Sequence, residues 1–169
     1  NGGTTVVKGD YLYYINGYVD ETKLEDEDDN EFGEVSFGAI FRTKLVNGNI
    51  EKDRDGFVVS TECVVPKVVG FSNGGFYIID DYIYYTTPNM HYSTDDGAIQ
   101  TSRVEFHKIK IDGTEDEKIY SPEKSESNLD WTIYKVDGTV YIVTFVDSKI
   151  VIINTTDDEI VTDTKLLQL

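Results

Sequence analysis

The sequence predicts an all-β protein, made of about three units of four antiparallel strands with propeller-like topology. A short pattern occurs three times: GDYLYY begins at Gly9, DDYIYY begins at Asp80, and the looser DGTVYI begins at Asp137. Each copy is a turn followed by an aromatic and aliphatic run, and repeats of this kind indicate a repeated architecture. The chain also holds 12 Tyr and 8 Phe, which favour pleated strands, and no segment is convincing as a helix.

The first unit, over residues 4–54, begins with two strands joined by a tight turn. Residues 6–8 and 11–15 alternate in period 2 around Gly9-Asp10, where Gly tolerates the positive φ that such a hairpin needs. The acidic residues 20–34 have almost no apolar content and read as a long exposed loop. The remaining strands are expected at residues 35–46 and 50–53, with Asn47-Gly48 as the turn between them.

The second and third units, over residues 75–120 and 131–162, follow the same plan. In the second, strands are expected at 75–79, 82–87, 104–111 and 118–120, with a polar loop at 88–101. In the third, strands are expected at 131–136, 139–145, 149–154 and 159–162. We expect residues 1–169 to form a single domain, or a fragment of one.

Two features fit this plan poorly. Residues 55–71 add length that a four-strand unit does not place. In addition, residues 41–48 and 106–113 align without a gap, yet their inward-facing positions fall out of phase by one residue. Either a β-bulge absorbs that shift or the repeat boundaries lie elsewhere.

These motifs resemble a known family. Asp81-Tyr82-Ile83-Tyr84-Tyr85 and the run Ile109 to Thr114, IKIDGT, are similar to the blade motifs of bacterial β-propellers of the low-density-lipoprotein-receptor-related type. The resemblance covers about three blades and implies a domain of unknown function from lipoproteins and cell-surface proteins of Firmicutes. It implies no catalytic residues.

The number of repeats leaves the architecture open. Closed propellers use about four to eight blades, whereas this chain shows three units. The chain is therefore a fragment of a longer protein, or one of two copies that complete a ring, or an open or sandwiched set of sheets.

Charge restricts the partners. The net charge of −17 disfavours nucleic acid and anionic membrane surfaces, and leaves cationic ligands, metal ions and neutral sugars open. The same charge also favours solubility without specifying any partner. No 18-residue apolar run is present, so no membrane-spanning helix is expected.

The single cysteine and the beginning of the chain bear on its location. Cys63 has no partner for an intrachain disulfide, and its apolar neighbours predict a buried structural thiol. The chain begins Asn-Gly-Gly without a signal peptide, as a trimmed or mature form or a piece of a longer protein would. With the family resemblance, this gives an extracellular or cell-surface location on a Gram-positive bacterium as the expectation.

The acidic loop suggests a calcium site. The run that begins at Asp26 starts like an EF-hand loop, with Asp26, Asp28 and Asn30 at the first ligand positions. Glu31 stands where that motif requires Gly, and Phe37 where it requires Glu, so an EF-hand is excluded. A looser Ca²⁺ site on these three residues remains, beside the alternative of a solvated charge run. His91 and His107 show no zinc-ligand spacing and are expected to be ordinary surface or strand residues.

Aromatic side chains are the other candidate binding groups. Tyr18, Phe32, Tyr92 and Trp131 are the rings that we expect to contact a peptide or glycan. Tyr92 is the foremost of them because it lies in the middle of a polar loop, although packing of the loop on the sheet would also explain it.

Enzymatic motifs are missing. The sequence contains no G-x-S-x-G and no glycine-rich phosphate loop, and its 32 acidic residues single out no glycosidase pair. The sequence therefore favours a non-catalytic binding or scaffold module that recognises protein, peptide or glycan through its long loops, with no cofactor other than Ca²⁺. The alternatives are a structural segment of a larger propeller and a carbohydrate-active hydrolase.

Overall fold

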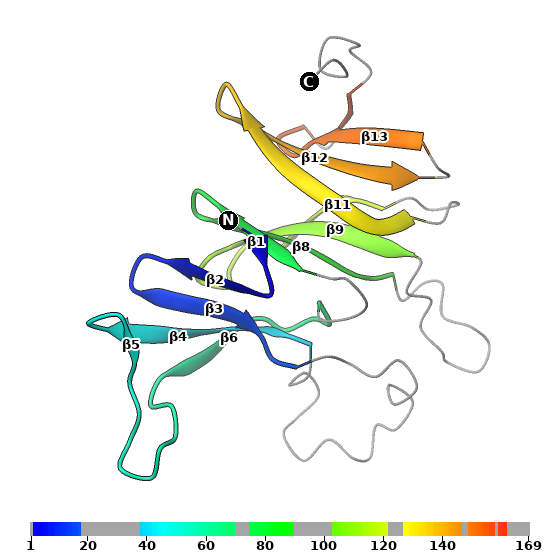
Figure 1. The fold of residues 1–169 in the computed structure, drawn as a ribbon. Coiled ribbons are helices and arrows are strands. Elements are labelled where there is room, and N and C mark those ends of the chain that lie inside the picture. The colour runs from blue at the N-terminus through cyan, green and yellow to red at the C-terminus, as the bar shows by residue number, and fades with distance from the viewer. Residues whose placement is uncertain are drawn as a thin grey trace, which may run out of the picture.

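The computed structural model describes residues 2–17, 38–69, 75–89, 103–121, 127–146, 149–157 and 159–161. These residues form three antiparallel sheets, here called sheets I, II and III in chain order, and contain no helix. Figure 1 shows the sheets arranged one above another, with sheet II in the middle. The all-β prediction is thus confirmed for the described residues, and these three sheets do not close into a ring.

Sheet I is built on β4, which pairs with strands on both sides. Its strands are β2 (Thr5–Lys8), β3 (Tyr11–Ile15), β4 (Ile40–Val46), β5 (Asn49–Ile50) and β6 (Thr61–Val65). The order is β2-β3-β4, and both β5 and β6 pair with β4. The predicted fourth strand at 50–53 is wrong: β5 is a two-residue hairpin arm, and β6 in the unplaced stretch 55–71 takes that position.

Sheet II is a meander with one strand added at its edge. Its strands are β1 (Gly2–Gly3), β7 (Phe76–Ile79), β8 (Tyr82–Pro88), β9 (Val104–Lys110) and β10 (Glu117–Tyr120), in the order β1-β7-β8-β9-β10. The predicted strands of this unit are confirmed, whereas β1 was not predicted. A Cβ on Gly2 would lie 2.2 Å from the Tyr77 ring, so the lack of a side chain lets β1 lie against that ring.

Sheet III is the most regular. It contains β11 (Ser127–Val136), β12 (Thr139–Val146), β13 (Lys149–Asn154) and β14 (Glu159–Ile160) in sequence order. These bounds agree with the predicted strands except that β11 begins earlier and β14 is shorter.

The first hairpin of each sheet turns in the same way. Its two turn residues are Gly9-Asp10, Asp80-Asp81 and Asp137-Gly138, and the first residue has φ of 57°, 51° and 50° respectively. Positive φ at this position matches the twist of paired strands. The predicted positive φ at Gly9 is confirmed, and aspartate adopts the same conformation in the other two sheets.

The phase shift between the first two units arises where strands β4 and β9 end. Tyr11 lies opposite Lys44 and Tyr82 lies opposite Lys110, so Lys44 and Lys110 are equivalent. Gly48 follows Lys44 by four residues and Gly113 follows Lys110 by three, because β4 continues to Val46 before its turn whereas β9 ends at Lys110. Bulges do occur, but in the pairing of the fourth strands, where Val64 and Ile119 are the extra residues. Both extra residues are buried.

Two apolar clusters hold the sheets together. One lies between sheets I and II and includes Tyr13, Ile40 and Phe76; the other lies between sheets II and III and includes Phe106 and Ile142. Strand β8 contributes to both, with Ile83 and Tyr85 in the first cluster and Tyr84 in the second. Sheet II is therefore covered on both faces, whereas sheets I and III each use one face in these clusters.

Candidate functional site

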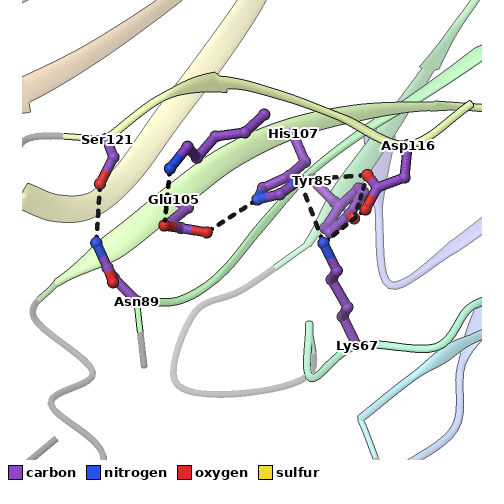
Figure 2. Close-up of polar contacts among 8 residues, drawn as sticks. Lys67, Tyr85, Asn89, Glu105, His107, Asp116 and Ser121 are labelled. Atoms are coloured by element: carbon purple, nitrogen blue, oxygen red, sulfur yellow. Dashed lines mark hydrogen bonds and ion pairs between the residues drawn. The ribbon is translucent and has the colours of Figure 1, made fainter. Parts of the chain in front are cut away.

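A partly buried polar network links sheet I to sheet II. Its members are Tyr85 from β8, Glu105 and His107 from β9, Asp116 just before β10, and Lys67 from the segment after β6. Figure 2 shows these side chains pointing toward one another. Because Lys67 follows a strand of sheet I while the others belong to sheet II, the network spans the interface between the two sheets.

The carboxylate of Asp116 is the centre of this network. The Tyr85 hydroxyl donates to its Oδ1 at 2.7 Å, and Lys67 Nζ donates to its Oδ2 at 2.5 Å. His107 Nδ1 lies 3.2 Å from the same Oδ1. Three donors thus surround one carboxylate, which is the arrangement that stabilises its charged form.

His107 lies between two carboxylates. Its Nε2 is 3.1 Å from Glu105, which also receives Lys118 Nζ at 3.5 Å. Ionised carboxylates only accept hydrogen bonds, so a ring nitrogen that carries the proton donates to the carboxylate that faces it. His107 as a whole is 4% exposed, and its ring stacks on Tyr85 with centroids 5.3 Å apart and planes at 24°.

The network shifts two pKa values in opposite directions. Burial alone would raise the pKa of Asp116, but the hydrogen bonds from His107, Lys67 and Tyr85 outweigh it and hold that pKa far below its usual range. Burial raises the pKa of Tyr85 far above its usual value, and the bond to the Asp116 carboxylate raises it further. Tyr85 is therefore a neutral donor and Asp116 an ionised acceptor. Since these donors and acceptors satisfy one another, the arrangement cross-links two sheets.

A groove of about 320 Å³ opens on the other side of sheet II, at its border with sheet III. Its lining includes the β7–β8 turn, the β11–β12 turn and the turn after β13, and consists of Asp80, Asp81, Tyr82, Tyr84, Lys108, Glu117, Gly138, Val140, Thr155 and Thr156. Volumes near 300 Å³ are at the small end of ligand sites. The groove is thus large enough for a small polar ligand.

Some of the charged side chains in the groove already form hydrogen bonds or ion pairs. Lys108 Nζ donates to the Thr155 carbonyl at 2.7 Å and pairs with Glu117 at 3.0 Å. Lys135 of β11 binds Asp80 at the rim at 2.6 Å. Among the described residues, Asp81 and Tyr82 make no hydrogen bond or ion pair through their side chains. These two groups can therefore receive a ligand without breaking an existing bond.

The sequence-predicted site residues fall mostly outside the described part of the chain. This applies to the calcium candidates Asp26, Asp28 and Asn30, and to the aromatic candidates Tyr18, Phe32 and Tyr92, as well as to His91. Within the described ranges, no group of three or more His, Cys, Asp or Glu side chains gathers in a way that could hold a metal ion.

Trp131 is the one predicted ligand-binding ring that the structure describes. It lies in strand β11, not in a loop, and is half-buried in the cluster between sheets II and III. Its ring packs in a T-shaped arrangement with Tyr77, at 4.7 Å between centroids, and with Phe106, at 5.7 Å. This packing accounts for Trp131 without a ligand.

The structure also revises what the sequence indicated about Cys63 and His107. Cys63 is exposed, so the prediction of a buried thiol is wrong. The bulge at Val64 turns both Val64 and Val65 inward and leaves the first half of β6 outside the core. His107 does lie on a strand, as expected, but it is buried among charges. No sequence motif indicated this: Asp116 reaches the ring across the β9–β10 hairpin of sheet II, and Lys67 reaches it only through the contact between sheets I and II.

Comparison with protein-family models, with curated proteins and with solved structures finds no match to this chain. In the part of the chain described, no helix is long and apolar enough to span a bilayer. The assignment of function therefore depends on the two sites described above.

Proposed function

We propose that this chain is a non-catalytic binding and scaffold module of propeller-like construction. The groove between sheets II and III is the observation that supports binding best. It combines the free Asp81 carboxylate, the Tyr82 ring and the Thr156 hydroxyl group. Carboxylates and hydroxyl groups bind sugar hydroxyls, and an aromatic face packs against a sugar ring. We therefore propose a small neutral sugar as the ligand class.

The polar network between sheets I and II supports the scaffold half of the proposal. A histidine between two carboxylates has the residue types of an acid–base site, but His107 is 4% exposed and Tyr85 is 1% exposed. Their bonding partners are the other members of the network. The groups that would be expected to perform chemistry instead stabilise the contact between sheets I and II. We further propose the extracellular or cell-surface location that the family resemblance implies.

The test is binding to a panel of neutral monosaccharides and short glycans, measured by calorimetry. We expect a ligand whose affinity falls at least about tenfold in Asp81→Asn and in Tyr82→Ala, since each loses about 1.4 kcal/mol or more of contact energy. Asp10→Asn is the matched control, because Asp10 is the second residue of the equivalent turn in sheet I and does not line the groove. If no glycan binds, or if the two groove variants bind as tightly as the unmodified chain, the binding proposal is wrong. Turnover of a glycoside by the chain would instead favour the hydrolase alternative.

A further inference from the structure

The pairing registers place equivalent residues of the three sheets on equivalent faces. Tyr13, Tyr84 and Tyr141 each occupy the third position after the first hairpin turn. Tyr13 is 1% exposed against sheet II, and Tyr84 is 4% exposed against sheet III. Side chains alternate along a strand, and Val140 and Ile142 face sheet II. Tyr141 therefore lies on the opposite face of sheet III, where the chain supplies no further sheet among its described residues.

The tyrosine of each sheet belongs to a row of four side chains on one face, and the three rows occupy equivalent positions. Each row crosses its sheet through directly paired positions: Val6, Tyr13, Arg42 and Glu62 in sheet I; Tyr77, Tyr84, Lys108 and Glu117 in sheet II; Tyr134, Tyr141, Asn154 and Glu159 in sheet III. The row thus keeps an apolar or aromatic residue, a tyrosine, a polar donor and a glutamate in that order.

In sheets I and II this row binds the next sheet. Arg42 pairs with Glu62 at 2.7 Å and donates to the Ile111 carbonyl of sheet II at 2.8 Å. Lys108 pairs with Glu117 and donates to the Thr155 carbonyl of sheet III. In sheet III the first member of the row, Tyr134, is 55% exposed, and Phe145 on the same face is 40% exposed. The outer face of sheet III therefore has the composition of a sheet-binding face and lacks a described sheet to bind.

The outer face of sheet I has the complementary composition. Leu12 and Tyr14 are equivalent to Ile83 and Tyr85 of sheet II, which are 0% and 1% exposed beneath sheet I. In sheet I these two positions point away from sheet II, with the Tyr14 ring stacked on Phe41 at 6.2 Å and Val7 beside them 55% exposed. The outer faces of sheets III and I thus correspond to the two faces that meet between sheets I and II and again between sheets II and III.

We propose that the outer face of sheet III docks on the outer face of sheet I of a second copy of this chain. Such a contact is head to tail, and it closes into a ring when the rotation between copies permits. Two copies of three sheets supply six sheets, within the range of about four to eight that closed propellers use. The occupant is therefore a second copy that forms a closed dimer through two identical contacts. This inference does not depend on the sugar proposal.

Sedimentation velocity over a wide concentration range tests the proposal. We expect the unmodified chain to change from one copy to two as its concentration rises. Val7→Asp on sheet I and Tyr134→Asp on sheet III should each raise the dissociation constant at least about tenfold, since each places a charge in an apolar contact. Val46→Asp is the matched control. Val46 is 43% exposed, but strand alternation places it on the other face of β4.

A chain that remains monomeric at every concentration overturns the proposal. An assembly that only one of the two end-face variants weakens also overturns it, because head-to-tail docking requires both faces. All three positions are exposed, so we expect the variants to fold, which near-ultraviolet circular dichroism checks. Tyr134→Ala provides a milder second variant. Asp81→Asn should leave the assembly unchanged, which separates failure of this proposal from failure of the sugar proposal.

Discussion

At the scale of single residues, Asp116 is the group whose charge matters most to the contact between sheets I and II. It accepts from Tyr85, Lys67 and His107, and it forms an ion pair with Lys67. Loss of its charge would leave these donors without their common acceptor. A partly buried cation that loses its partner is costly, so this residue links pH to stability.

The pH dependence of stability tests this role. Since the pKa of Asp116 is lowered on folding, its contribution is fully present above the unfolded value near 4 and is lost as pH falls below it. We expect Asp116→Asn to lower the free energy of unfolding at neutral pH by about 1–3 kcal/mol, the range for an unsatisfied buried group. Between neutral pH and about pH 3 the variant should lose less stability than the unmodified chain.

Urea unfolding at the two pH values, monitored by tryptophan fluorescence, measures both quantities, with Asp10→Asn as the control. Equal acid sensitivity of the unmodified chain and Asp116→Asn would contradict this role of Asp116. The other carboxylates of the chain are common to both proteins and cancel in the comparison.

At the scale of elements, the turn after β9 is fitted closely to sheet I. Gly113 has φ of 85°, and a Cβ there would lie 3.0 Å from the Val64 carbonyl oxygen. Gly138 in the β11–β12 turn has a similar φ of 88°, but a Cβ there would meet no atom within 4 Å. Both glycines have the positive φ that disfavours a side chain, but only Gly113 also lies against the neighbouring sheet. Comparing them therefore separates the cost of backbone strain from the cost of steric overlap.

The loss of stability on alanine substitution at these glycines measures how closely the turn packs on sheet I. We expect Gly138→Ala to cost about 1–2 kcal/mol, the strain of positive φ for a residue with a Cβ. Gly113→Ala should cost at least about 1 kcal/mol more, because the methyl group overpacks the contact between sheets. Chemical denaturation of both variants measures the difference. Equal costs at the two positions would show that the contact with Val64 is loose.

At the scale of the whole molecule, charge opposes compactness. The net charge of −17 produces self-repulsion, which salt screens over a Debye length of about 10 Å at 0.1 M. Ion pairs such as Arg42 with Glu62 are weakened by the same salt, but exposed pairs contribute little. We therefore expect added sodium chloride to raise the midpoint of thermal unfolding. A midpoint that falls with salt would show that the ion pairs outweigh the repulsion.

Measuring the midpoint of thermal unfolding in CaCl₂ and in MgCl₂ at equal ionic strength tests the calcium hypothesis. Screening alone predicts the same midpoint with CaCl₂ and MgCl₂. A selective rise with Ca²⁺ that Asp26→Asn and Asp28→Asn remove would support the proposed site at Asp26, Asp28 and Asn30. Equal midpoints with the two salts would argue against it.

The sequence alone determined the hairpins, because their signals are local. The turn residues Asp80-Asp81 and the alternation of Tyr82 to Tyr85 lie within a few positions of each other and predict paired strands. The all-β class and the strands of sheets II and III follow from such signals. Strand β6 was not predicted, because its partner β4 lies about twenty residues earlier and its exposed first half lacks an alternating pattern.

Only the tertiary structure decided which side chains meet between sheets. Lys67 meets His107 and Asp116 because sheet I packs on sheet II, and no spacing in the sequence encodes that contact. The same holds for the exposure of Cys63 and for the packing of Trp131, since both depend on which face of a sheet is covered. Strand identity is a local property of the chain, whereas burial depends on the neighbouring sheet.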